Sequence, residues 1–271
     1  MSSADKSGEY KLRDLTGEVL IITGATSGIG RQTAYAAVAA GAKVVLNART
    51  KEKLAELVKE LGEENATYLA GDCAEADVAR SIAATALKKF GKIDAVIPNA
   101  GIGMYGSILD YSDEQITSML RTNIDASIHI IRASLPSMIK AATGDIVITA
   151  SVAGFHAAAN QAIYSGTKHA QVGIAAALDR ELREKGIRVA LVCPAGVDTE
   201  FAMGTIRFSV GKNTSEEEIN RASKIIIETV NQFNTDGKEI QQSSSTDFST
   251  IKLTKYTQGL GCACKLRPQE L

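Results

Sequence analysis

Short runs of β-branched and other apolar residues alternate along the chain with longer stretches in which apolar positions recur every three or four residues. The short runs predict strands at residues 19–23, 43–47, 67–71, 93–98, 145–150 and 187–193. The longer stretches predict helices that begin near Ile29, Lys51, Glu75, Asp113, Gln161 and Ser215. Continuously apolar strands are buried on both faces, and their alternation with helices implies right-handed crossovers. The pattern therefore predicts an α/β fold, a Rossmann-like doubly wound parallel sheet with helices on both faces.

One domain of ordinary size accounts for the pattern, and we place it at residues 18–271. Residues 1–17 are polar and lack the apolar segment of a secretory signal, so we expect a flexible lead-in. Residues 201–214 combine glycines with no clear periodicity, which is typical of a substrate loop. Residues 235–258 are rich in polar side chains and are interpreted as an insertion, either a solvated loop or a cover for a neighbouring subunit.

Composition narrows the class of protein. A net charge of −1 with scattered Lys and Arg gives no basic surface for nucleic acid, and no apolar run has the length of a membrane span. The 4 cysteines are mostly dispersed, which suits a reducing compartment, and the 3 histidines are scattered, so we expect no metal site. We therefore expect a cytoplasmic protein with neither nucleic acid nor membrane as a partner.

A glycine-rich turn follows the first predicted strand and leads directly into a helix. Glycines in such a turn permit a tight bend and a close approach of the backbone to a pyrophosphate, while the start of the helix presents N–H groups to phosphate. The place of the turn in the first strand-helix-strand unit favours a dinucleotide ligand. The residues concerned are Gly24, Thr26, Ser27, Gly28, Ile29 and Gly30.

Tyr164 and Lys168 stand four residues apart in a predicted helix, and Ser151 ends the strand before it. The tyrosine and the lysine then lie one turn apart on the same face, where an ammonium can approach a phenol. A carbonyl that accepts hydride at carbon needs a proton at oxygen, and a phenol made more acidic by a cation can supply it. Taken singly, Tyr164 and Lys168 could equally be a surface pair, and Ser151 could be a cap at the end of its strand.

The motifs in this order resemble the short-chain dehydrogenase/reductase family over about residues 15 to 200. Besides the glycine turn and the Tyr-x-x-x-Lys pair, Asn99-Ala100-Gly101 follows the fourth strand, with Pro98 in place of the family's first Asn. Asn123 lies in the next helix, and a Pro-Gly segment at residues 193–199 closes the sixth strand. Four landmarks in register make coincidence an unsatisfactory explanation.

The resemblance implies roles for four catalytic residues. Tyr164 is the acid/base, and Lys168 lowers its pKa, together with a bound nicotinamide, and holds the nicotinamide ribose. Ser151 forms a hydrogen bond to the substrate oxygen, and Asn123 anchors a water that completes a proton relay through Lys168. Tyr164 and Lys168 also count as cofactor contacts. The resemblance adds further cofactor contacts at Asn99, Ala100, Gly101, Pro194, Gly196, Val197 and Thr199.

The end of the second strand bears on the choice of cofactor. Relatives that prefer NAD commonly carry Asp where this chain has Ala48, so we interpret Arg49 as the ligand of a 2′-phosphate. Asn47 and Thr50 are expected as secondary contacts, and Arg31 either helps or is merely solvated. The expected cofactor is NADP(H). Asp72, with Cys73 beside it, matches the family position that contacts adenine, although a helix N-cap role for Asp72 fits nearly as well.

The expected reaction is hydride transfer between nicotinamide and a small or medium carbonyl or secondary alcohol. Pocket residues are expected in 103–105, 152–160 and 197–214, with His156 either contacting a polar substituent or facing solvent. One alternative is a 3-hydroxy acid dehydrogenase, suggested by Thr199-Glu200-Phe201. Others are a non-catalytic NADP(H)-sensing protein and an epimerase or dehydratase. Family members pair through the helices near Asp113 and Gln161, so a homodimer or homotetramer is expected.

Overall fold

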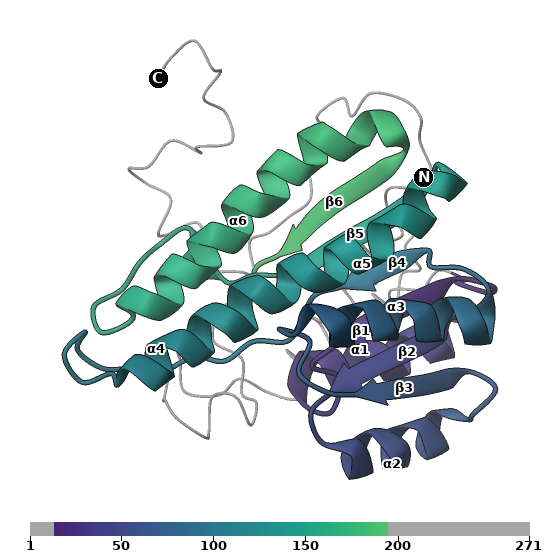
Figure 1. Ribbon diagram of the computed structural model, residues 1–271, viewed down its shortest axis with the longest axis horizontal. Helices are drawn as coiled ribbons and strands as arrows, with labels where there is room; N and C mark the ends of the chain where they lie inside the picture. Colours follow the sequence, from purple (N-terminus) through teal and green to yellow (C-terminus); the bar gives the residue numbers. More distant parts are fainter. Residues whose placement is uncertain (1–13, 195–271) are drawn as a thin grey trace, which may run out of the picture. The chain divides into compact units, whose positions relative to one another are not determined.

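One parallel sheet runs through residues 14–194, the part of the chain that the computed structural model describes (Figure 1). Its strands are β1 (Val19–Thr23), β2 (Lys43–Ala48), β3 (Ala66–Ala70), β4 (Ala95–Ile97), β5 (Gly144–Thr149) and β6 (Ile187–Val192). They lie in the order β3-β2-β1-β4-β5-β6, and each neighbouring pair is parallel. The predicted α/β fold class and doubly wound topology are confirmed.

The helices are α1 (Gly28–Ala39), α2 (Lys51–Leu61), α3 (Ala76–Phe90), α4 (Asp113–Leu120), α5 (Ala126–Ala141) and α6 (Ala162–Leu182), with short 3-10 turns at Val152–Gly154 and Arg183–Lys185. Five of the helices begin within one residue of a predicted position, and α5 follows α4 after a short turn without a predicted start of its own. The helix predicted from Ser215, the substrate loop 201–214 and the insertion 235–258 lie outside the described residues. Near the other end, Leu15 is buried and its N–H donates to Ala40 O, so the domain includes residues before 18.

Alternate residues of each central strand pack against different helices. Leu20 and Ile22 of β1 belong to a core shared with α1 and α2, whereas Val19 and Ile21 belong to a core shared with α3, α5 and α6 (Figure 1). All five residues of β1 and all six of β5 are buried. This two-sided burial is why β1 and the centre of β5, Ile146–Ile148, are mainly apolar, and it confirms helices on both faces.

A π-helical turn at Arg121–Asp125 joins α4 to α5, and together they form one long helix that leads to β5 (Figure 1). Asn123 is at the centre of this turn and is completely buried. Single π turns inside α-helices occur frequently at functional sites, because they change the direction of side chains and carbonyl groups locally. Here the turn brings Asn123 against the residues that follow β4.

Strands β1 and β4 are neighbours in the sheet although the chain between them forms β2 and β3. The helix after β1 packs on one face of the sheet and the helices after β4 pack on the other. In a doubly wound sheet, ligands bind at the carboxyl ends of the strands where the order of connection reverses. The fold therefore directs the candidate site to the ends of β1 and β4 and of the adjacent β5.

Candidate active site

The ends of β1 and β4 are joined through the side chains of Thr23 and Asn99. Thr23 Oγ1 accepts hydrogen bonds from the main-chain N–H groups of Asn99 and Ala100, both at 3.0 Å. The Asn99 side-chain amide donates to Thr23 O at 3.0 Å and to Gly24 O at 3.3 Å. These bonds fix the Asn99-Ala100-Gly101 segment beside the glycine turn. Thr23 is 1% exposed, so its role is to build the site.

The glycine turn has no space for larger side chains. A Cβ on Gly30 would lie 2.4 Å from Gly24 O, and a Cβ on Gly24, whose φ is +65°, would lie 2.9 Å from Ala100 Cα. Ser27 precedes α1 in an extended conformation, its side chain does not cap the helix, and the first turn holds no acidic residue. An uncapped helix start without negative charge suits a phosphate. The predicted residues of the turn thus form a cradle that fits a dinucleotide.

Ser151 and Tyr164 come together although they are thirteen positions apart in the sequence. Ser151 follows β5 in an extended conformation, and its Oγ accepts a hydrogen bond from Ala153 N at 3.1 Å and lies 3.5 Å from Pro194 O. Tyr164 is in the first turn of α6, is 6% exposed, and is hydrogen-bonded to the Ser151 side chain. A hydroxyl pair in this arrangement can address a single substrate oxygen.

Burial raises the pKa of Tyr164 above its ordinary value, and the hydrogen bond with Ser151 opposes this increase only in part. The Lys168 ammonium lies 5.8 Å from the centre of the tyrosine ring. The Lys168 ammonium donates its hydrogen bonds to groups other than Tyr164. The lowering of the Tyr164 pKa by Lys168, which the family resemblance implies, is therefore not seen in the protein alone. The reason is that desolvation of a phenol in a closed site disfavours the phenolate.

Lys168 is buried, at 4% exposure, and donates from Nζ to Thr149 O at 3.0 Å and to Gln171 Oε1 at 2.9 Å. Burial lowers the pKa of Lys168 to about 8, and the nearby thiol of Cys193 opposes this shift. A Cβ on Gly101 would lie 3.7 Å from Lys168 Nζ, so the glycine leaves the ammonium room on the side of β4.

The side chain of Asn123 holds the loop after β4. Its Oδ1 accepts from Ile102 N and its Nδ2 donates to Ile102 O, both at 2.8 Å, while Nδ2 also donates to Thr167 Oγ1 at 2.9 Å. The main-chain oxygen of Asn123 accepts hydrogen bonds from Ser127 Oγ at 3.0 Å and from Gln171 Nε2 at 2.8 Å. Asn123 thus connects the β4 loop to the helix that carries Tyr164 and Lys168.

At the end of β2, Arg49 and Thr50 are exposed, whereas Asn47 is buried. The Asn47 amide donates to Leu69 O at 2.9 Å and to Gly71 O at 3.2 Å, so its N–H groups hold the end of β3. Asn47 O accepts from Ala25 N at 3.1 Å, which ties the glycine turn to this strand. Among the described residues, Arg49 has no hydrogen-bond or ion-pair partner, and it lies two residues after Asn47.

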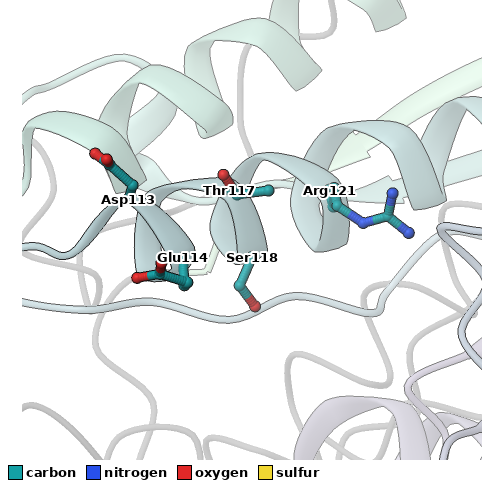
Figure 2. A pocket seen from close by; sticks show the side chains of 5 residues that line it. All are labelled: Asp113, Glu114, Thr117, Ser118 and Arg121. Atoms are coloured by element: carbon teal, nitrogen blue, oxygen red, sulfur yellow. The ribbon is translucent and has the colours of Figure 1, made fainter.

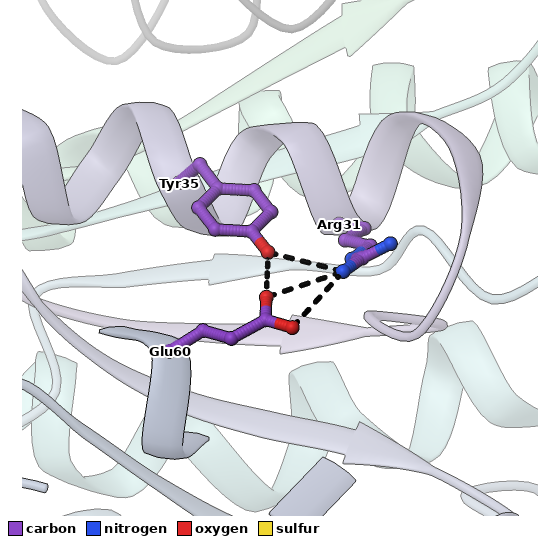
Figure 3. A network of polar contacts seen from close by, with 3 residues as sticks. All are labelled: Arg31, Tyr35 and Glu60. Atoms are coloured by element: carbon purple, nitrogen blue, oxygen red, sulfur yellow. Dashed lines mark hydrogen bonds and ion pairs between the residues drawn. The ribbon is translucent and has the colours of Figure 1, made fainter. Parts of the chain in front are cut away.

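Arg31, in contrast, is engaged with two side chains (Figure 3). Its Nη2 donates to Tyr35 Oη at 3.1 Å and pairs with Glu60 at 3.1 Å, and Tyr35 also donates a hydrogen bond to Glu60. The bond to Tyr35 is the main reason that the pKa of Arg31 is raised. This network joins α1 to α2 and gives Arg31 a structural partner, so the guanidinium is not merely solvated.

Asp72 does not cap a helix, because the N-cap of α3 is Glu75. Asp72 Oδ1 instead accepts from Ala74 N at 3.0 Å, and Arg121 approaches Asp72 Oδ2 at 4.0 Å. The N-cap interpretation of Asp72 is therefore wrong, and its contact with adenine stays a prediction. Cys73 beside it is buried, and burial raises the pKa of its thiol to about 12.

Tyr164 belongs to an apolar cluster. Tyr164, Met119 and Ala153 form a buried cluster against which Ile102, Met104, Tyr111 and Ile163 pack. His156 is exposed. Pro194 is described and lies close to Ser151, whereas the predicted contacts Gly196, Val197 and Thr199, and the Thr199-Glu200-Phe201 sequence, are outside the described residues.

Comparison with known proteins agrees with this geometry. The family model for short chain dehydrogenases matches residues 18–208. The chain belongs to the short-chain dehydrogenase/reductase family. This short-chain dehydrogenase is 34% identical over 185 residues to an uncharacterised oxidoreductase of Staphylococcus aureus (strain MW2), an alignment covering 68% of this chain and 80% of the relative.

Two solved structures from Brucella melitensis are also similar to this short-chain dehydrogenase. One is a short-chain dehydrogenase/reductase named glucose/ribitol dehydrogenase, with a TM-score of 0.72, 28% identity, and coverage of 81% of this chain and 91% of the other. The other is a 3-ketoacyl-(acyl-carrier-protein) reductase complexed with NADH, with a TM-score of 0.68, 29% identity, and coverage of 72% and 82%. Membership of the family supports an oxidoreductase that binds a nicotinamide cofactor.

Three residues of the site were not predicted from the sequence of this short-chain dehydrogenase. Thr23 stands in the glycine motif but was not assigned a role, and Thr149 contributes only its main-chain oxygen. Gln171 contacts both Lys168 and Asn123. Its spacing of three residues from Lys168 on a helix was the one available signal, since such residues are neighbours on the helix surface.

Other features of the described residues add no second centre. A shallow pocket on α4 and the adjoining turn is lined by Asp113, Glu114, Thr117, Ser118 and Arg121 (Figure 2). These side chains come from consecutive turns of a single helix, so no second wall encloses a ligand. Within residues 14–194 no group of His, Cys, Asp or Glu side chains could hold a metal ion, and no helix has the length and hydropathy needed to cross a bilayer.

Proposed function

We propose that this protein is an NADP(H)-dependent oxidoreductase that interconverts a carbonyl and a secondary alcohol. The observation that carries the proposal is the hydrogen bond between Tyr164 and Ser151 at the end of β5, with the Lys168 ammonium one helical turn away. A proton donor and a second hydroxyl at one position are what reduction of a carbonyl requires on the oxygen side. A protein that only senses NADP(H) has no need of this constellation.

The dinucleotide fits the cradle formed by the glycine turn and the start of α1. Its pyrophosphate would meet the helix start at Ser27 and Gly28, and its nicotinamide ribose would meet Lys168. When bound, the nicotinamide supplies or accepts the hydride. Gly101 offers no side chain on this side, so the backbone after β4 forms an open floor near Lys168.

Side chains of the protein transfer the proton and hold the substrate oxygen. In reduction, Tyr164 donates its hydroxyl proton to the substrate oxygen as the carbonyl carbon receives hydride, and Ser151 holds that oxygen by a hydrogen bond. The raised pKa of Tyr164 keeps the phenol protonated before reaction, which suits a general acid. In oxidation Tyr164 must first lose its proton, so alcohol oxidation is expected to be favoured at higher pH than carbonyl reduction.

Arg49 supports the preference for NADP(H). Its guanidinium is exposed at the end of β2 and lacks a partner among the described residues, whereas Arg31 is paired with Glu60. A guanidinium free to form a bidentate pair suits the 2′-phosphate that distinguishes NADP from NAD.

Substitution Arg49→Asp should therefore weaken NADPH binding and favour NADH. Equal preference before and after the substitution would contradict the assignment, and Arg80→Asp on the outside of α3 is the control.

The apolar cluster around Tyr164 favours a substrate whose carbonyl carries small or medium apolar groups.

We further propose a cytoplasmic homodimer or homotetramer that pairs through the long α4–α5 helix and α6. Sedimentation equilibrium of the full chain tests the assembly, and a monomer at micromolar concentration would rule it out.

The decisive experiment is a panel of carbonyls and secondary alcohols monitored at the nicotinamide absorbance with NADPH and NADH. On the best substrate, Tyr164→Phe should reduce kcat by about 10²- to 10⁴-fold, the usual contribution of a general acid, while NADPH affinity stays nearly unchanged. Tyr68→Phe, in strand β3, is the matched control and should leave turnover intact. NADPH binding without turnover of any compound would favour the sensing protein, and full turnover by Tyr164→Phe would reject the mechanism.

A further inference from the structure

Gln171 connects the two halves of the site through a buried side chain. Its Nε2 donates to Asn123 O at 2.8 Å and to Ser127 Oγ at 3.0 Å, and its Oε1 accepts from Lys168 Nζ at 2.9 Å. Gln171 is 1% exposed. All three polar positions of a primary amide, two N–H groups and one oxygen, are therefore matched to partners.

The orientation of this amide follows from the chemistry of its neighbours. The ammonium of Lys168 has only donors, so it must face Oε1, and the carbonyl oxygen of Asn123 has only lone pairs, so it must face Nε2. A flipped amide would place two donors against each other and two acceptors against each other. The bridge therefore runs in a single direction, from the lysine ammonium through the amide to the main chain of the π-helical turn.

The bridge also engages the main-chain oxygen of Asn123, the residue to which the family resemblance assigns a water. A main-chain carbonyl offers two lone pairs. Those of Asn123 O are taken by Ser127 Oγ and by Gln171 Nε2. The solvent link between Asn123 and Lys168 expected from the resemblance thus meets an oxygen that is already satisfied.

We propose that Gln171 is a positioning residue that fixes the Lys168 ammonium to the π-helical turn in place of a water-linked relay. The inference rests on the proposed function, because it concerns how Lys168 is presented to the nicotinamide ribose. An ammonium has three donors, and Thr149 O and Gln171 Oε1 take two of them. The third is left for the cofactor, so the amide sets the direction in which Lys168 can act.

The protonation of Lys168 provides a test of this role, because it should change the affinity for NADPH. The titratable groups that face the ammonium within the described residues are Tyr164 on the same helix and Cys193 after β6. Because the pKa of Lys168 is about 8, its affinity for the ribose should weaken as the pH rises through that value. The dissociation constant of NADPH, measured by the fluorescence of bound NADPH from pH 6 to pH 10, should show this midpoint.

Two substitutions should move the midpoint in opposite directions. Gln171→Met has a similar volume but removes the acceptor, so the midpoint should fall by about one pH unit. Gln171→Glu keeps an oxygen beside Lys168 and adds a negative charge, so the midpoint should rise by about one pH unit. Ser134→Ala is the matched control, because the buried Ser134 hydroxyl donates to Ile130 O within α5 and is not part of the Gln171 bridge, and its midpoint should equal that of the wild type.

A purely structural role would change both variants in the same way. Midpoints that stay fixed, or that move in the same direction in both variants, would overturn the inference, and if circular dichroism shows that one variant does not fold, the sign of the other decides. NADPH binding is measured independently of turnover. Wild-type turnover of carbonyls together with fixed midpoints would refute the role of Gln171 alone, whereas shifted midpoints without turnover would refute the proposed reaction.

Discussion

Replacing Lys168 by Met tests the burial that defines this site. Folding lowers the pKa of Lys168 from 10.5 to about 8, because desolvation disfavours the ammonium. A group whose folded pKa is depressed in this way destabilises the folded protein at pH values below the folded pKa, where it must be buried with its charge. As the pH rises from about 8 toward 10.5, the folded protein loses this proton before the unfolded chain does, and this residue makes the protein more stable.

The size of the effect follows from the shift. One unit of pKa difference corresponds to about 1.4 kcal/mol, so Lys168 should add about 2 kcal/mol to the free energy of unfolding between pH 7 and about pH 9.5. Lys168→Met cannot show this increase. At neutral pH the substitution removes a buried charge but leaves Thr149 O and Gln171 Oε1 without their donor, at a cost of about 1–3 kcal/mol each. These effects oppose each other, so only the pH dependence is diagnostic.

Urea unfolding monitored by circular dichroism at both pH values measures the effect directly. The increase in unfolding free energy between the two should be about 2 kcal/mol larger for the wild type than for Lys168→Met. Comparing the two proteins in this way cancels the contributions of groups that titrate in both of them to the pH dependence of the unfolding free energy. Lys53→Met, an exposed position on α2, is the control and should follow the wild type. Parallel behaviour of the wild type and Lys168→Met would show that the lysine is not desolvated as described.

Two further substitutions test the frame of the site. Gly30→Ala would place a Cβ 2.4 Å from Gly24 O and 2.5 Å from the Asn99 amide. Such overpacking costs on the order of 1–3 kcal/mol, so NADPH affinity in a fluorescence titration should fall by about tenfold or more, and an unchanged value would contradict the cradle. Arg188→Ala removes a bidentate partner, at 2.6 Å to both oxygens, from the buried Asp145 carboxylate. It should lower the free energy of unfolding by on the order of 3 kcal/mol, and a loss below about 1 kcal/mol would count against it.

The sequence allowed the fold and the Tyr164–Lys168 pair to be predicted for physical reasons. Strands buried on both faces are mainly apolar, so β1 and the centre of β5, Ile146–Ile148, could be recognised from residue type. Residues four apart on a helix share a face whatever surrounds them. The proximity of Ser151 could be predicted only through the family motif, because the chain between β5 and α6 has no periodicity that fixes its path.

The properties that depend on surroundings could not be predicted in the same way. The pKa of Tyr164 is raised because the phenol is buried, and burial at a given position results from all the elements packed around it. The alternative N-cap role for Asp72 is wrong because Asp72 and Glu75 both precede α3, and only the backbone decides which of them is the last residue outside the helix. A motif names the residues of a site without giving their exposure.

Gln171 shows where prediction from a motif ends. Its bond to Lys168 is local and follows from helical spacing, but its bond to Asn123 spans 48 positions and exists because a π-helical turn presents a carbonyl toward α6. The Gln171 amide links the Lys168 ammonium to the main-chain oxygen of Asn123, and a water could form this link only if the side chain were absent. The four residues to which the family resemblance assigns catalytic roles could therefore stand on two different supports, and we infer that the residue at position 171 determines which of these supports this protein uses.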